Sequence, residues 1–179
     1  SQESKIPYEI GFIKNKYIGR TFISPGQSSR LNQVKIKLSV IEENVRDKRV
    51  ILIDDSIVRG TQLGETTEFL YSSGAKEVHI RPACPPLMFG CPYLNFSRSK
   101  SEMDLITRRI IAAREGENVS REVLESYANP DSQNYKEMLE EIGKQLNFTT
   151  LHFHRLDDLL SSIPIEPCKV CTYCFSGKK

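Results

Sequence analysis

The sequence predicts an α/β fold in which helices flank a parallel sheet. Residues 50–53 (VILI) form an apolar run without alternation, which is typical of a strand covered on both faces. A helix is expected over 62–73, with Gly74 just beyond its end, and a second strand over 77–82. A strand, a helix and a strand within roughly 35 residues make a βαβ unit, and such units build parallel sheets.

The other expected elements lie on both sides of this unit. A strand is predicted over 8–13, followed by a basic loop over 14–30. Apolar residues spaced three and four apart predict a helix over 29–45. Beyond the unit, periodicity predicts helices over 101–115, 120–128 and 132–146, a strand over 149–153 and a helix over 155–163.

Length and composition limit the class of protein. The chain has 179 residues, which is the size of one domain or of one domain with an appendage. A formal net charge of +2 gives no reason to expect nucleic-acid or membrane binding by bulk electrostatics. No apolar run approaches the roughly 20 residues of a membrane span, and no secretory signal is visible. We expect a cytoplasmic protein with a core over 1–96, a mainly helical part of the same domain over 97–163 and a Cys-rich tail over 164–179.

The stretch from Arg49 to Thr61 (RVILIDDSIVRGT) carries the predicted chemistry. Asp54 and Asp55 follow the first strand of the unit, at the carboxyl end where ligands of parallel sheets bind. The loop then enters a helix, whose N-terminal N–H groups and dipole favour a phosphate. Hydroxyls at Ser56 and Thr61 add donors, and the carboxylates suit sugar hydroxyls and Mg²⁺. A phosphorylated ribose is therefore preferred as the ligand over a simple polar turn with a helix cap.

This stretch resembles the phosphoribosyl pyrophosphate (PRPP) binding signature of type I phosphoribosyltransferases, and its SIVRGT part is especially similar to the glutamine amidophosphoribosyltransferase family. Residues 6–30 and 74–93 resemble the segments on either side of the signature in that family, and the tail CTYCFSG is similar as well. The segment from about 97 to 150 departs from the family pattern. The resemblance implies a type I phosphoribosyltransferase fold with a helical C-terminal extension.

The resemblance also implies roles for the matched positions. Arg20 and Lys37 would be catalytic cations that contact the pyrophosphate, and Asp54 and Asp55 would contact the ribose hydroxyls and Mg²⁺. In the family reaction, ammonia displaces pyrophosphate from PRPP and gives 5-phosphoribosylamine, the first committed step of de novo purine (IMP) synthesis. The PRPP-binding residues implied in this way are Asp54, Asp55, Ser56, Ile57, Val58, Arg59, Gly60 and Thr61.

Five cysteines form two groups. Cys84 and Cys91 flank a Pro-rich loop, whereas Cys168, Cys171 and Cys174 crowd the tail at the spacing of metal ligands. The spacing alone leaves open zinc, an iron–sulfur cluster and reduced thiols in a flexible tail. The resemblance implies a [4Fe–4S] cluster held by Cys91, Cys171 and Cys174, with the fourth family ligand upstream and Cys168 as a substitute candidate. Cys84 is expected to be a buried small side chain.

Partners follow from the resemblance too. In the family, ammonia comes from glutamine in an N-terminal glutaminase domain, to which nothing in this sequence is similar. We therefore expect the chain to be the C-terminal part of such an enzyme, weakly active or inactive alone, with purine nucleotides as feedback ligands and a homo-oligomeric full-length form. A nucleobase phosphoribosyltransferase and a non-catalytic PRPP-sensing regulator remain as alternatives. The Cys-rich tail and the lack of a visible DNA-binding module favour the amidotransferase.

Overall fold

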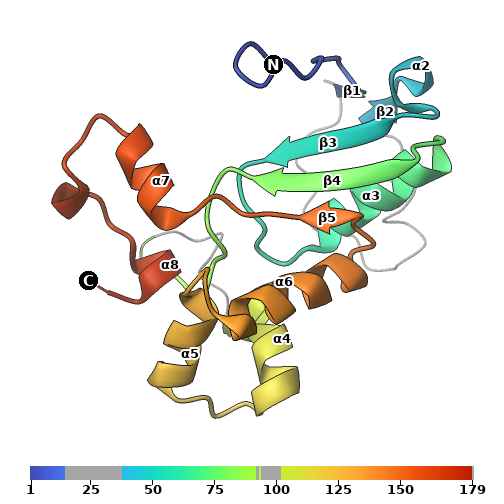
Figure 1. Ribbon diagram of the computed structural model, residues 1–179. Helices are drawn as coiled ribbons and strands as arrows, with labels where there is room; N and C mark the ends of the chain where they lie inside the picture. The colour runs from blue at the N-terminus through green and yellow to red at the C-terminus, as the bar shows by residue number, and fades with distance from the viewer. Residues whose placement is uncertain (15–37, 92, 94–101, 179) are drawn as a thin grey trace.

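A computed structural model describes residues 1–14, 38–91, 93 and 102–178 (Figure 1). Its centre is a parallel sheet with the strand order β3-β4-β5, formed by β3 (Arg49–Asp54), β4 (Glu77–Pro82) and β5 (Thr150–Leu151). Two shorter strands, β1 (Phe12–Lys14) and β2 (Leu38–Val40), pair antiparallel in a sheet of their own.

The predicted βαβ unit is confirmed. Helix α3 (Thr61–Ser72) connects β3 to β4, and these strands pair in parallel from Arg49 with Glu77 to Asp54 with Pro82. Gly74 lies just beyond α3 with a φ of +94°, a left-handed conformation that glycine adopts without strain. The three strands point the same way, so their carboxyl ends meet at one edge of the sheet, where Asp54 lies.

The second half of the chain is mainly helical, as predicted. Ser120 and Ser132 each cap a helix there, because their side chains accept hydrogen bonds from backbone N–H groups of the first turn. The helical elements of the described chain outside the βαβ unit are α2 (Glu42–Val45), η1 (Glu102–Asp104), α4 (Ile106–Glu115), α5 (Arg121–Ala128), α6 (Gln133–Gln145), α7 (Leu156–Ser162), η2 (Pro167–Lys169) and α8 (Tyr173–Ser176).

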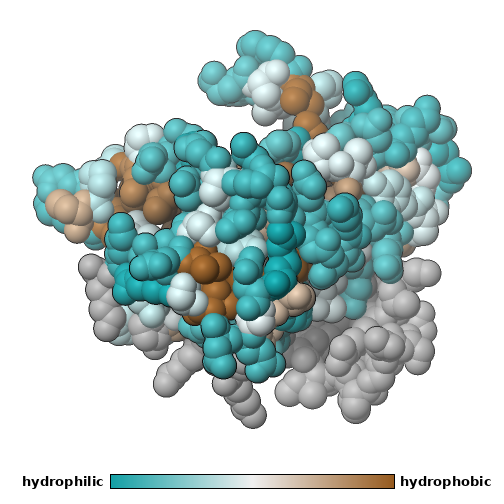
Figure 2. Space-filling view, turned by 60° about the horizontal axis from the view of Figure 1, so that its bottom comes forward, coloured by the Kyte–Doolittle hydropathy of each residue, from teal (hydrophilic) through white to brown (hydrophobic). Residues whose placement is uncertain are grey.

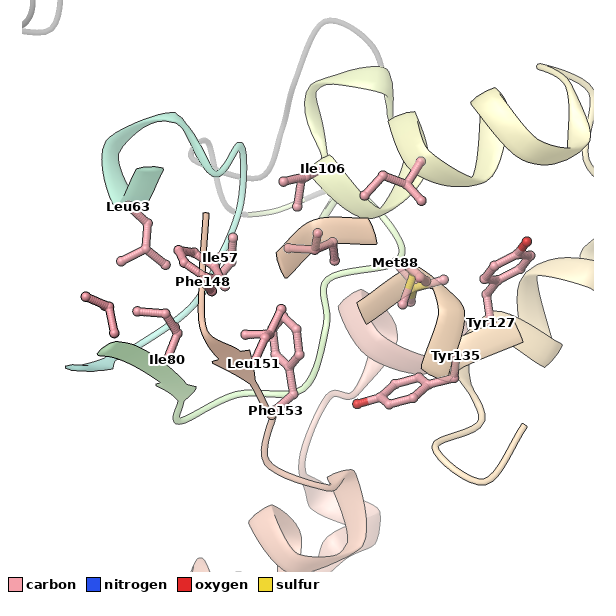
Figure 3. Packing of buried hydrophobic residues seen from close by; sticks show 14 of the residues in the cluster. Ile57, Leu63, Ile80, Met88, Ile106, Tyr127, Tyr135, Phe148, Leu151 and Phe153 are labelled. Carbon is pink, nitrogen blue, oxygen red and sulfur yellow. The ribbon is translucent and has the colours of Figure 1, made fainter. Parts of the chain in front are cut away.

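The main core lies on one side of the sheet, where α3, α4 and α6 pack (Figures 1 and 3). Val78 and Ile80 of β4 and Ile142 of α6 are fully buried, and Ile106 of α4 is almost completely buried in the same cluster. Seen from the side of α4–α6, the surface is mostly hydrophilic with small separate hydrophobic areas (Figure 2). In the described part of the chain, no helix is long and apolar enough to cross a membrane.

Two predictions about local structure are wrong. In the part of the expected helix over 29–45 that the structure describes, residues 38–40 form a strand and 42–45 a helix, because Val40 pairs with Phe12 of β1 and this tertiary pairing overrides the helical period. The run at 50–53 is not covered on both faces by described residues: Ile53 is 73% exposed and Ile51 is 41% exposed. The described helices cover only the side of β3 that carries Val50 and Leu52.

Candidate functional site

The two predicted carboxylates lie at the carboxyl edge of the parallel sheet. Asp54 ends β3, and the backbone N–H of Asp55 donates to Asp54 Oδ1 at 2.9 Å. Ser56 Oγ donates to Asp55 Oδ1 at 2.8 Å. Burial raises the pKa of Asp54, the hydrogen bond from Asp55 opposes this rise, and the charge of Asp55 adds to it. Two acids therefore stand side by side at the point where ligands of parallel sheets bind.

Backbone donors follow directly after the carboxylates. From Ser56 to Leu63, no backbone N–H donates a hydrogen bond to any acceptor that the structure describes. Gly60 is the N-cap of α3 and has a φ of +78°, so the chain turns sharply into the helix at this residue. Successive N–H groups at a helix N-terminus form a concave anion site. The predicted Ser56–Thr61 loop therefore presents unpaired backbone donors of the kind that hold phosphates.

The back of this loop is held by the helical segment formed by η1 and α4. Ile106 N donates to Val58 O at 2.9 Å, and Arg109 Nη2 donates to Arg59 O at 2.7 Å. Arg59 also forms an ion pair with Asp104 at 3.2 Å. Sequence reasoning missed these contacts, because nothing in the local pattern of residues 102–110 indicates what the segment touches about 50 residues away.

The segment that follows β4 holds the backbone of the two aspartates. Ala83 N donates to Asp54 O at 2.8 Å, and Cys84 N donates to Asp55 O at 3.1 Å. His154 Nδ1 donates in turn to Ala83 O at 3.2 Å. Cys84 is only partly buried, which corrects the expectation of a buried small side chain, and burial followed by the charge of Asp55 raises its pKa.

The Cys-rich tail packs against the loop that follows β4. Met88 N and Phe89 N both donate to Cys174 O, at 2.8 and 3.0 Å, and the rings of Phe89 and Tyr173 lie 5.9 Å apart. Gly177 has a φ of +67°, and a Cβ on it would come within 2.8 Å of Phe89 Cζ. Of the alternatives for the tail, a freely flexible segment is therefore not what the structure describes.

This packing brings together the three cysteines proposed as ligands. The Cys174 thiol is hydrogen-bonded to Cys91 and interacts electrostatically with Cys171. Burial, and then the neighbouring Cys91, raises the pKa of Cys174 to about 11. Cys168 instead lies near Glu166, with Sγ 3.9 Å from Oε2. The five cysteines, all within the described residues, form no disulfide, and no described group of three His, Cys, Asp or Glu side chains is already arranged as a metal site.

Two of the predicted site residues, Arg20 and Lys37, lie outside the described residues.

A cavity of about 330 Å³ lies away from the predicted phosphate loop. It is lined among others by Tyr135, His154 and Arg155, and it includes no residue of the 54–61 segment. Asp55, Arg59 and Thr61 are exposed, so the predicted phosphate site is open to solvent at the sheet edge.

Comparison with known proteins adds the family. No family model matches the chain. Amidophosphoribosyltransferase of Archaeoglobus fulgidus is 48% identical over 103 residues, which is 58% of this chain and 22% of that protein. The Methanocaldococcus jannaschii amidophosphoribosyltransferase is 35% identical over 99% of this chain and 31% of its own length.

A solved structure gives the same result for the fold. Glutamine PRPP amidotransferase of Bacillus subtilis, complexed with ADP and GMP, superposes with a TM-score of 0.69 and 32% identity. The match covers 99% of this chain and 33% of that one, and it confirms the predicted α/β fold. The chain thus spans about a third or less of the length of the relatives it matches. Identities of 33% to 36% along nearly the whole chain show that it belongs to the amidophosphoribosyltransferase family.

Proposed function

We propose that the chain carries the PRPP-binding part of an amidophosphoribosyltransferase that makes 5-phosphoribosylamine for purine synthesis. The observation that carries the proposal is the row of unpaired backbone N–H groups from Ser56 to Leu63, in the described chain, directly beside Asp54 and Asp55. The names of the relatives favour this reaction over nucleobase transfer and over a PRPP-sensing regulator.

The site would act mainly by positioning and charge. The loop N–H groups and the N-terminus of α3 hold the 5′-phosphate, with the hydroxyls of Ser56 and Thr61 as further donors. Asp54 and Asp55 accept hydrogen bonds from the ribose hydroxyls and provide oxygen ligands for Mg²⁺, which would neutralise phosphate charge when bound. Negative charge beside the ribose also stabilises the oxocarbenium character that develops at C1.

The reaction balances without a covalent enzyme intermediate. The nitrogen of ammonia forms a bond to C1 as the bond from C1 to oxygen breaks, pyrophosphate leaves with the electron pair, and the attacking nitrogen loses a proton. Arg20 and Lys37 remain the proposed cations for the leaving pyrophosphate. Ammonia would come from glutamine through a further domain. The ADP and GMP bound to the Bacillus subtilis relative support purine nucleotides as ligands, and feedback inhibition and a homo-oligomeric full-length enzyme are part of the proposal.

A [4Fe–4S] cluster on Cys91, Cys171 and Cys174 is part of the proposal. The observation that supports it is the convergence of these thiols, since Cys174 interacts with both of the others. Thiolates are the usual ligands of iron–sulfur clusters, and a cluster here would tie the tail to the loop after β4. Cys168 is the nearest further thiol in the sequence for a fourth position. The role would be structural or oxygen-sensing in a cytoplasmic enzyme.

Asp54→Asn is expected to raise the Kd of PRPP with Mg²⁺ by at least about tenfold, the effect of about 1.4 kcal/mol. The ligand-free variant should be as stable as the native chain at pH 7, or more stable. A raised pKa means that Asp54 contributes stability below the ordinary aspartate pKa of about 4, and this contribution is lost as the pH rises through the raised value. Calorimetric titration and thermal unfolding at pH 4 and pH 7 measure the two effects.

Asp131→Asn is the matched control. The hydrogen bonds and charge of Arg155 lower the pKa of Asp131, so this carboxylate contributes stability above the ordinary aspartate pKa. Its removal should lower the Tm at pH 7 and leave PRPP binding unchanged, because Asp131 is not part of the loop. Unchanged binding by Asp54→Asn, or no PRPP binding by the native chain, would remove the basis of the proposed function.

A further inference from the structure

The phosphate loop is shaped by a cation that does not belong to the signature. We propose that Arg109 of α4 is a positioning residue, which orients the backbone donors of the loop toward the ligand. The inference rests on the proposed function, because it concerns the same phosphate. It assigns a role to a residue of α4, which lies outside the signature but inside the part of the chain that the relatives match.

Two successive carbonyl groups of the loop face α4. Val58 O accepts from Ile106 N at 2.9 Å, and Arg59 O accepts from Arg109 Nη2 at 2.7 Å. The first contact comes from the backbone and is independent of the side chain present. The second depends wholly on Arg109, because it is made by the end of its guanidinium group.

Because each peptide unit is planar, these two contacts fix the direction in which the N–H groups of the loop point. In a trans peptide, the N–H points opposite to the C=O of the same unit. When Val58 O faces α4, the N–H of Arg59 must point away from α4, and when Arg59 O faces α4, the N–H of Gly60 must do the same. Both N–H groups therefore point away from the helix that holds the loop. They lack an acceptor in the described chain, as do the N–H groups in the first turn of α3.

The charge of Arg109 strengthens this effect. A hydrogen bond from a guanidinium group is charge-assisted, and it polarises the peptide that accepts it. The N–H of Gly60, on the other side of that peptide, then becomes a better donor to an anion. The Arg59 side chain does not substitute for this contact, since its guanidinium group is paired with Asp104 at 3.2 Å.

A purely structural role for Arg109 is the competing explanation, and Arg114 provides its control. Arg114 is on the same helix and also makes long-range contacts, with Nε donating to Tyr127 Oη at 3.0 Å and an ion pair to Glu137. These contacts anchor the other end of α4, away from the loop. Loss of Arg114 therefore weakens the packing of α4 without freeing the carbonyl of Arg59.

The test compares Arg109→Met, Arg109→Lys and Arg114→Met in the chain described above. Calorimetry measures the Kd of inorganic phosphate, ribose 5-phosphate and PRPP with Mg²⁺, and urea unfolding measures stability. Arg109→Met should raise the Kd of all three ligands about tenfold, because they share the phosphate. Arg109→Lys should recover part of the affinity through one hydrogen bond. Arg114→Met should unfold at lower urea and keep each Kd within about twofold.

Each outcome gives a decision. If the native chain binds PRPP and Arg109→Met binds it with the same Kd, the positioning role is overturned and the proposed function stays intact. A loss of affinity in Arg114→Met equal to that in Arg109→Met overturns it as well, because the effect would then follow the stability of α4. Absence of PRPP binding by the native chain overturns both. A selective loss in Arg109→Met with partial recovery in Arg109→Lys supports the proposal.

Discussion

Gly60→Ala is expected to lose about 2–5 kcal/mol of unfolding free energy and its measurable affinity for ribose 5-phosphate. Gly60 has a φ of +78°, which costs a residue with a Cβ about 1–2 kcal/mol. The new Cβ would lie 2.7 Å from Ile106 Cδ1 and 2.9 Å from Leu146 Cδ1. Ile106 is only 1% exposed, so its displacement disturbs the core and adds about 1–3 kcal/mol.

The binding loss has the same cause as the loss of stability. The backbone N–H of Ile106 holds Val58 O, so a shift of Ile106 also moves the loop that carries the phosphate donors. Urea unfolding measures the stability, and calorimetric titration with ribose 5-phosphate measures the affinity.

Alanine substitutions at two other glycines distinguish the cost of backbone strain from the cost of a steric clash of the new Cβ. Gly116 has a φ of +89°, but a Cβ there would meet nothing within 4 Å, so Gly116→Ala should show the strain alone. Gly143 lies inside α6 with open space around it, and Gly143→Ala should be stabilising by about 0.5–1 kcal/mol. If Gly60→Ala unfolded at the same urea concentration as Gly116→Ala and bound the ligand normally, the contact with Ile106 would have no role in the site.

The parts of the fold that were predicted correctly are those determined by residues close together in the sequence. The βαβ unit has a β-branched run, a helix that ends before Gly74 and a second apolar strand, all within one short stretch. The position of the loop proposed to bind phosphate was predictable for the same reason, because strand, carboxylates, loop and helix are consecutive from Arg49 onward. Each of these features depends on residues only a few positions apart.

The failures depend on partners far away in the sequence. Residues 38–40 have a helical period, yet they form a strand because β1 supplies a pairing edge. The exposure of Ile51 and Ile53 depends on what lies over the sheet, which an apolar run does not specify. Arg109 likewise has no local feature that distinguishes it from a solvated surface residue, and only the folded chain brings it to Arg59.

The cysteines fall between these cases. Their spacing in the tail is local and indicated metal ligands, but it left open zinc, a cluster and reduced thiols. The convergence of Cys91 with the tail is non-local, and it depends on the hydrogen bonds from Met88 and Phe89 to Cys174 O. This packing places Cys91 next to Cys174, and metal analysis has to decide between the proposed cluster, zinc and reduced thiols.

Replacement of Cys91, Cys171 or Cys174 by Ser is expected to abolish iron loading, whereas Cys84→Ser should retain it. The first three thiols interact through Cys174, while Cys84 lies beside Asp55 at the sheet edge. Anaerobic reconstitution followed by iron and sulfide analysis measures the loading of each variant. A hydroxyl ligates iron poorly compared with a thiolate, so the loss should be nearly complete rather than partial.

Two controls make the result specific to the cluster. Without iron, the variants and the native chain should have nearly the same unfolding free energy, because the backbone hydrogen bonds from Met88 and Phe89 to Cys174 O do not need the thiol. Retained PRPP binding in Cys91→Ser would show that the lost iron does not reflect a disrupted phosphate loop. A colourless native protein that carries zinc would exclude the cluster and keep the same ligands, since zinc also binds converging thiolates. Equal iron loading in Cys84→Ser and Cys91→Ser would instead exclude Cys91 as a ligand, despite its contact with Cys174.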